Sequence, residues 1–164
     1  MALYVLLVLA SCFLTSSFAT NDTLSNEPTY TNPLMLTNTS FPIAIQGIIL
    51  CQESNSYQPI KGATAKISCV IVDKEGGQKD PIFVTGSPSD HKGYFFAMFD
   101  PNKLGMDPYN EVQCKVCLGY SPLETCSFPS DVNNGFSGAL LTSPRLLVGS
   151  INLYTVGPFH YTSL

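Results

Sequence analysis

The stretch Ala63-Thr64-Ala65-Lys66-Ile67-Ser68-Cys69-Val70-Ile71-Val72 alternates in character with a period of two residues. Small and apolar side chains, Cys69 among them, occupy the odd positions, and the even positions begin with Thr64, Lys66 and Ser68. Successive side chains of a β-strand point to opposite faces of its sheet, so this pattern predicts a strand with one buried face. We expect Cys69 to point into the core.

Short apolar runs of this kind continue from Ile43 onward, separated by Gly, Pro, Asn and Asp. None of them shows the sustained 3.6-residue period of a long helix. We therefore predict an all-β fold, an antiparallel β-sandwich or barrel of about seven to eight strands that disulfides staple together. The predicted strands cover residues 43–51, 63–72, 82–85, 94–99, 111–118, 138–142, 145–153 and 154–161.

The N-terminal segment, residues 1–19, is an apolar run followed by small and polar residues and ends in Ser17-Phe18-Ala19. This arrangement is typical of a cleavable secretory signal peptide, and the run is too short for a membrane span of about 20 residues. We expect a mature chain that begins at Thr20 and is secreted to the extracellular space or cell wall. No later apolar stretch reaches spanning length, so the sequence predicts no transmembrane segment.

Residues 20–42 are rich in Asn, Thr, Ser and Pro and have no sustained period. This composition predicts an extended polar leader before a single β domain over residues 43–164. The leader contains N-glycosylation sequons at Asn21 and Asn38, whereas Asn32 is followed by Pro33 and is blocked. Because the secretory route makes both sequons available, we expect a glycoprotein.

Charged residues are sparse, at 12% of the chain, and the formal net charge is −4. Such a chain lacks the basic surface that offsets phosphate charges, so we expect no nucleic-acid partner. Hydrophobic residues make up 45% of the sequence, which is enough for a core and excludes global disorder.

The cysteines that would remain after signal-peptide cleavage are Cys51, Cys69, Cys114, Cys117 and Cys126. In an oxidising compartment, five cysteines predict two disulfides and one leftover thiol. Strand alternation places Cys69 and Cys114 on inward faces, which favours a bridge between them across the core. That bridge leaves Cys51 to pair with Cys126.

Cys114 and Cys117 have the Cys-x-x-Cys spacing that also occurs in redox and zinc sites. A redox pair needs a turn into a helix start and zinc needs four converging ligands, whereas residues three apart on a strand face opposite ways. We therefore predict that Cys117 points outward, as a free thiol, a mixed disulfide or an intermolecular link.

The sequence contains no recognisable set of catalytic residues. The histidines are His91, in a turn, and His160, near the end of the chain, and no Gly-x-Ser-x-Gly motif frames a serine nucleophile. The acidic residues Asp73, Glu75, Asp80 and Asp90 lie in turn-like segments, where carboxylates usually cap loops. We expect a protein that is not an enzyme and needs no cofactor or metal.

Short motifs follow one another in a fixed order, namely Gln46-Gly47-Ile48-Ile49-Leu50-Cys51, Pro59-Ile60-Lys61-Gly62-Ala63, Gly93-Tyr94-Phe95, Cys114-Lys115-Val116, Ser121-Pro122, Asn133-Asn134-Gly135 and Tyr154-Thr155-Val156-Gly157-Pro158-Phe159. In this order they resemble the olive-pollen-allergen and extensin-like family, also found as the cysteine-containing domain of non-classical arabinogalactan proteins. The resemblance covers residues 45–161. It implies a plant cell-wall or extracellular protein without known catalysis, built as a β-barrel or sandwich.

Carried over by position, the resemblance also implies the disulfides Cys51–Cys126 and Cys69–Cys114. The chain departs from the olive allergen at Gln52, which follows Cys51 where that protein has a Cys-Arg-Ala-Gly-like motif.

The resemblance further implies binding to a wall polysaccharide, either a pectic galactan or an arabinogalactan-type glycan. Sugar-binding surfaces combine apolar ring faces with hydrogen-bonding groups, and the candidate residues are Tyr94, Tyr120, Asn133 and Asn134. In residues 94–99, however, apolar side chains occupy both faces, which is more typical of a strand buried on both sides. The alternative function is a secreted protein ligand for a receptor ectodomain.

Overall fold

The computed structural model describes residues 41–72, 77–106 and 111–163. The expected signal peptide, most of the leader and the sequons at Asn21 and Asn38 lie outside this part. The described strands are β1 (Ile43–Glu53), β2 (Ser56–Pro59), β3 (Thr64–Val72), β4 (Ile82–Thr85), β5 (Tyr94–Phe99), β6 (Glu111–Tyr120), β7 (Phe128–Pro129), β8 (Ala139–Leu140), β9 (Arg145–Leu147) and β10 (Ile151–Thr162). Three short 3-10 helices join them, η1 (Pro101–Leu104), η2 (Glu124–Cys126) and η3 (Val132–Asn134).

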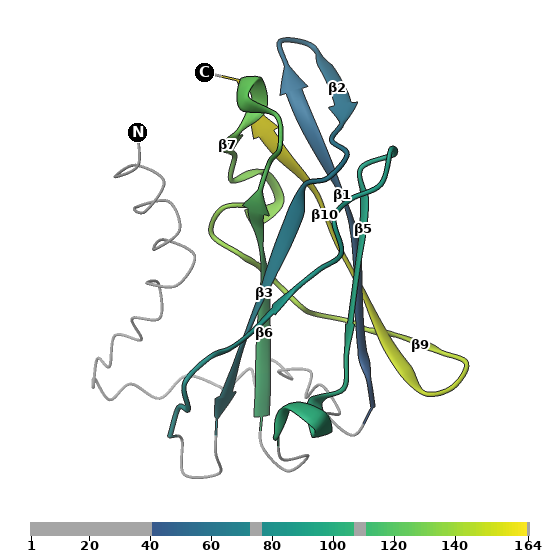
Figure 1. Ribbon diagram of the computed structural model, residues 1–164. Coiled ribbons are helices and arrows are strands. Elements are labelled where there is room, and N and C mark those ends of the chain that lie inside the picture. Colours follow the sequence, from purple (N-terminus) through teal and green to yellow (C-terminus); the bar gives the residue numbers. More distant parts are fainter. Residues whose placement is uncertain (1–40, 73–76, 107–110, 164) are drawn as a thin grey trace, which may run out of the picture.

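These strands form two sheets that enclose one hydrophobic core (Figure 1). The larger sheet has the order β2-β1-β10-β7, with β5 also paired to β1 and β9 to β10. The smaller sheet has the order β4-β3-β6-β8. The predicted all-β fold is confirmed, and the described strands make two sheets rather than a closed barrel.

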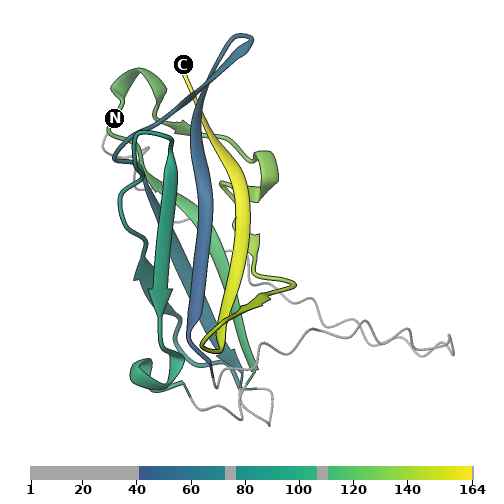
Figure 2. The same cartoon turned by 90° about the vertical axis from the view of Figure 1, so that its right-hand side faces the viewer.

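The pairing of β1 with β10 is parallel, whereas every other described strand pair is antiparallel (Figure 2). The two strands run side by side from Ile43 opposite Asn152 to Gln52 opposite Thr162. A purely antiparallel sheet was therefore the wrong expectation for this pair. Parallel neighbouring strands are not joined by a hairpin, so no turn motif in the sequence predicts their pairing.

Strand boundaries follow the sequence closely where one face is buried, and β4 and β5 have the predicted limits. The predicted strand over residues 145–153 is wrong, because the chain reverses there. Gly149 and Ser150 adopt positive φ angles of 86° and 59°, and β9 folds back antiparallel on the start of β10. A tight reversal needs such left-handed residues, which end a strand despite its apolar side chains.

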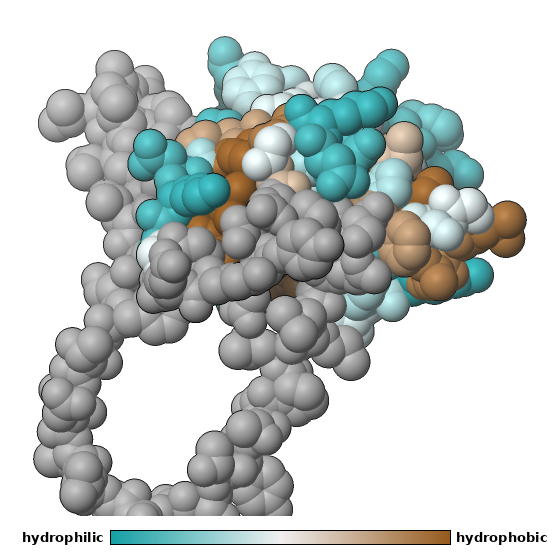
Figure 3. Space-filling model, turned by 90° about the horizontal axis from the view of Figure 1, so that it is seen from below, coloured by the Kyte–Doolittle hydropathy of each residue, from teal (hydrophilic) through white to brown (hydrophobic). Residues whose placement is uncertain are grey.

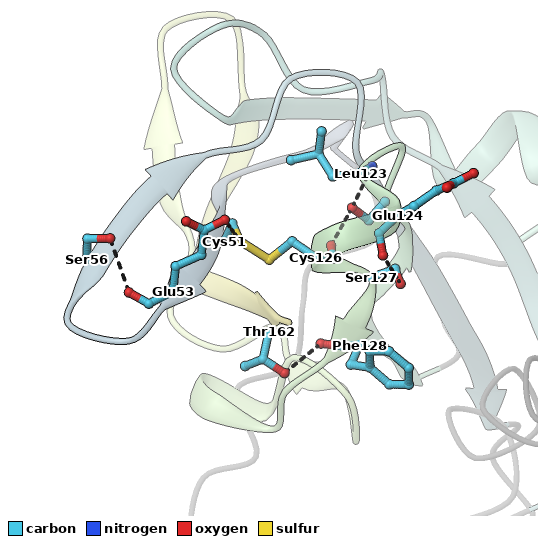
Figure 4. The surroundings of a disulfide bond; sticks show 10 residues. Cys51, Glu53, Ser56, Leu123, Glu124, Cys126, Ser127, Phe128 and Thr162 are labelled. Atoms are coloured by element: carbon cyan, nitrogen blue, oxygen red, sulfur yellow. Dashed lines mark hydrogen bonds between the residues drawn. A yellow bond between two sulfur atoms is a disulfide. The ribbon is translucent and has the colours of Figure 1, made fainter. Parts of the chain in front are cut away.

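The two expected disulfides are both present, and each ties a different part of the sandwich. Cys51 of β1 is bonded to Cys126 of η2, and this bridge links the larger sheet to the segment that follows β6 of the smaller sheet (Figure 4). Cys69 and Cys114 stand directly opposite each other on β3 and β6, with 4.0 Å between their Cα atoms. That second bridge joins neighbouring strands of one sheet, so the expectation that it crosses the core is corrected.

Cys117 is disulfide-bonded, and its partner lies outside the described residues. Of the three alternatives predicted for Cys117, the free thiol is therefore wrong. Cys117 does lie on the sheet face opposite Cys114, as strand alternation predicts, but only 2% of its surface is exposed. Its sulfur lies close to Gly138, where an added Cβ would be 3.2 Å away. The segment before β8 thus packs over a position that the sequence placed in solvent.

Candidate functional site

The outer face of β5 carries three adjacent large side chains. Tyr94, Phe96 and Met98 are 38%, 37% and 58% exposed, respectively. The residues that alternate with them point into the core and are Phe95, Ala97 and Phe99. The expectation of a strand buried on both sides is corrected, because no second layer covers this face among the described residues.

The neighbouring strand β1 extends this exposed surface. Antiparallel pairing sets Tyr94 opposite Ile48, which is 42% exposed, and Phe96 opposite Gln46. Directly opposed residues of two strands share one face of the sheet, so these side chains form a continuous surface. We call Tyr94, Phe96, Met98 and Ile48 the β5 platform.

A short chain of hydrogen bonds crosses the sheet beside the β5 platform. The Tyr94 hydroxyl donates to Oε1 of Gln46 at 3.1 Å, and Nε2 of Gln46 donates to Oγ1 of Thr155 on β10, also at 3.1 Å. These contacts connect β5, β1 and β10 and orient the Tyr94 ring. Uncharged hydrogen-bonding groups therefore lie next to exposed apolar rings.

The turn before β5 fixes the position of Tyr94. The Asp90 carboxylate accepts hydrogen bonds from the backbone N–H groups of Lys92 and Tyr94, which lowers the pKa of Asp90. Gly93 has a φ of 76°, and a Cβ there would collide with the Ile49 carbonyl oxygen. The sequence Asp90-His91-Lys92-Gly93 is therefore a turn that only glycine can complete at its last position.

Asn133 and Asn134 lie beside the far edge of the same sheet. Both adopt positive φ angles in η3, and Nδ2 of Asn133 donates to the Pro158 carbonyl of β10 at 2.8 Å. Pro158 lies where β10 carries an extra residue relative to β1, next to Ile48. Gly135, which follows η3, lies against the ring of the buried Phe159, and its carbonyl accepts a hydrogen bond from the Leu118 N–H of β6. This segment therefore lies at the edge between the two sheets, whereas Tyr94 lies on β5, on the other side of β1.

Tyr120 is not part of this surface. It lies at the end of β6 in the smaller sheet, opposite Thr64, and 61% of its surface is exposed. The structure therefore does not gather the sequence-predicted site residues into one surface. Tyr94 lies on the outer face of the larger sheet, Asn133 and Asn134 lie in η3 beside β10, and Tyr120 lies on the smaller sheet.

Sequence reasoning missed one part of this face, at the short edge strand β2. Tyr57 of β2 is 56% exposed, and its ring centroid lies 4.9 Å from that of His160 on β10. His160 is only 7% exposed. Ser54 and Asn55 form a two-residue turn between β1 and β2, and this turn was the available signal.

His160 makes the stability of the protein depend on pH. Burial lowers the pKa of its imidazole below the ordinary value of 6.5. Its neighbours on the adjoining strands include Leu50 of β1, Tyr57 of β2 and Ser130 after β7, and none of these three carries a charge. As the pH falls through 6.5 the unfolded chain binds more protons than the folded chain, so the free energy of unfolding falls.

We therefore expect urea unfolding to show a stability decrease as the pH is lowered from about 7.5 to about 5, and a smaller decrease in His160→Gln. Asp90 and Asp131 have pKa values below 3.8, so their protonation changes the free energy of unfolding at a lower pH than this window. Equal pH dependence in the two proteins would contradict the assignment to His160.

A second apolar surface lies at the β9–β10 hairpin. Leu146 is 62% exposed and Val148 is fully exposed. Seen from below, hydrophobic residues gather at the right-hand end of the molecule, on the side to which this hairpin projects (Figures 1 and 3).

Within the described residues, no group of three or more His, Cys, Asp or Glu side chains could hold a metal ion. No helix in that same part is long and apolar enough to cross a membrane.

The chain is similar in sequence to several plant proteins. It is 46% identical over 123 residues to the seed and root hair protective protein of Arabidopsis thaliana, and the match covers 74% of each chain. The chain belongs to the family of that protein. No family model matches the sequence.

Two further members of this family group are longer proteins. Proline-rich protein 1 of Arabidopsis thaliana is 35% identical over 73% of this chain, and a pistil-specific extensin-like protein of Nicotiana tabacum is 32% identical over 72% of it. The chain spans about a third of either relative, 33% and 30%. These relatives agree with the extensin-like part of the resemblance and with a plant cell-wall protein family, whereas the pollen-allergen part stays a prediction.

Solved structures resemble this fold only distantly. A chlorocatechol 1,2-dioxygenase from Pseudomonas putida superposes with a TM-score of 0.38 at 16% identity, over 77% of this chain and 61% of that chain. A likeness at this level says nothing about function.

Proposed function

We propose that this protein is a secreted, non-enzymatic component of the plant cell wall that binds a neutral wall polysaccharide, a pectic galactan or an arabinogalactan-type glycan. The observation that carries the proposal is the β5 platform, an exposed aromatic surface bordered by the Tyr94–Gln46–Thr155 hydrogen bonds. Its family membership among plant proline-rich and extensin-like proteins supports the location.

The composition of this surface suits a neutral sugar. Apolar faces of sugar rings stack on aromatic side chains, and their hydroxyl groups pair with nearby amides and hydroxyls. Met98 and Ile48 widen the apolar area, and Gln46 and Thr155 supply hydrogen-bonding groups on either side of the Tyr94 hydroxyl contact. Because none of these side chains is charged, attraction to the glycan does not depend on ion pairing.

We expect Tyr94→Ala to weaken retention on immobilised galactan or arabinogalactan by about fivefold to tenfold, because it removes the stacking ring. Affinity electrophoresis of the purified protein on each polysaccharide measures this change. Tyr120→Ala is the control, since it removes a more exposed tyrosine ring from the other sheet, and it should bind like the unchanged protein.

Retention should also change little when salt is raised, because screening acts on charges and the β5 platform has none. Equal losses in the Tyr94 and Tyr120 variants would contradict the assignment to this face. If no wall polysaccharide retains the protein and a receptor ectodomain does, the protein is a receptor ligand instead.

A further inference from the structure

His160 and Ser130 are cross-strand neighbours at the upper end of the face that holds the β5 platform. Tyr161 is paired with Pro129, and the Ser130 N–H donates to the His160 carbonyl at 2.9 Å, so the ladder continues by one residue. Opposed residues of an antiparallel pair share one face. His160 also stands opposite Leu50, which places the pair on the outer side of the larger sheet.

Both side chains have a buried polar atom without a hydrogen-bond partner. These atoms are Nδ1 of His160 and Oγ of Ser130. His160 is only 7% exposed, and its Nδ1 is shielded from solvent. Folded proteins provide hydrogen-bond partners for nearly all buried polar atoms. Two unpaired polar atoms on neighbouring residues therefore indicate that a group from outside the chain forms hydrogen bonds with them.

The Tyr57 ring lies against the His160 ring and belongs to an exposed edge strand. Its ring centroid is 4.9 Å from that of His160, and all four residues of β2 are exposed. β2 is an edge strand that pairs only with β1, over Leu50–Glu53. Displacing the Tyr57 side chain would therefore expose the side of the His160 ring that it contacts, and it would leave the core between the sheets intact.

The chemistry of the two orphan atoms selects a hydroxyl group. A hydroxyl both donates and accepts, so it can pair with Nδ1 in either imidazole tautomer and with the Ser130 hydroxyl. A charged ligand would lose its hydration without gaining a counter-charge, because Leu50, Tyr57 and Ser130 are uncharged. The exposed Tyr57 ring offers the apolar stacking surface that a sugar ring requires.

We propose that His160 Nδ1 and Ser130 Oγ form a subsite for a hydroxyl group of a neutral saccharide, uncovered when the Tyr57 ring swings aside. The proposal rests on the proposed function, since it extends the glycan surface beyond the β5 platform. Ile48 and Leu50 are successive outward residues of β1, about 7 Å apart, so one saccharide chain can contact Tyr94 and His160 together.

The experiment uses two probes, free galactose at high concentration and a neutral galactan oligosaccharide. The ¹⁵N resonances of the His160 ring report occupancy of the subsite, and calorimetry gives the oligosaccharide affinity. We expect the Nδ1 resonance to shift with both probes. We also expect Ser130→Ala to bind the oligosaccharide about twofold to tenfold more weakly, without loss of thermal stability, because it deletes a hydroxyl that has no partner in the free protein.

His160→Phe should weaken binding to a similar extent while it keeps a ring beneath Tyr57. Tyr120→Ala is the control that leaves both surfaces unchanged. A protein that binds the oligosaccharide through Tyr94, with an unmoved Nδ1 resonance and full affinity in Ser130→Ala, would overturn the subsite and leave the proposed function standing. A galactose-induced shift without any polysaccharide binding would support the subsite and refute the proposed function. An ordered water that stays on both atoms at saturating galactose would also overturn the subsite.

Discussion

Replacing Cys51 and Cys126 together by alanine is expected to lower the free energy of unfolding by about 4 kcal/mol. The two residues are 75 positions apart, so their bridge removes much of the conformational freedom of the unfolded chain. It also ties β1 of the larger sheet to η2, which follows β6 of the smaller sheet. A loss of this size is a large share of the stability of a small domain.

Urea unfolding of the oxidised protein and of the double variant measures the difference. Reduction of the unchanged protein does not serve as the control, because it also opens the Cys69–Cys114 bridge and the disulfide of Cys117. The variant for comparison is Cys69→Ala with Cys114→Ala, whose bridge closes a shorter loop, with a sequence separation of 45, and should therefore cost slightly less when it is removed. If removing Cys51 and Cys126 costs less than about 1 kcal/mol, the bridge does not constrain the chain in the way that its sequence separation predicts.

Phe95→Ala is expected to lower the free energy of unfolding by about 3 to 5 kcal/mol, whereas Phe96→Ala, one residue further on, should cost about 1 kcal/mol or less. Phe95 is fully buried and its ring lies 6.4 Å from that of Phe159. An added Cβ at Gly47 would be 2.6 Å from the Phe95 ring, so this part of the core is already filled. Removing the ring leaves a cavity that such close packing cannot refill.

Phe96 belongs to the β5 platform, and 37% of its surface is exposed. Its replacement should therefore weaken polysaccharide retention and leave the urea unfolding midpoint nearly unchanged. The pair of variants separates stability from binding within two adjacent residues of one strand. Similar unfolding midpoints for both variants would show that β5 does not have one buried and one exposed face.

The sequence by itself determined the properties that depend on alternation along a single strand. The two-residue period of β3 and β6 placed Cys69 and Cys114 on inward faces, and both residues are buried. The turn residues around β4 and β5 marked the limits of both strands. Such features are local, because the direction of a side chain follows from its position in the strand.

Only the tertiary structure decided which strands are neighbours and which faces stay uncovered. Apolar residues on both sides of β5 do not reveal that Tyr94, Phe96 and Met98 remain outside, since no pattern within the strand records a missing second layer. The parallel pairing of β1 with β10 likewise depends on residues about 110 positions apart, such as Gln46 and Thr155, which are separated by 109. That pairing sets His160 opposite Leu50 and against the Tyr57 ring, whereas Tyr120 lies on the other sheet. The sequence does not reveal these positions, because the backbone hydrogen bonds that align two strands are the same whatever side chains the strands carry.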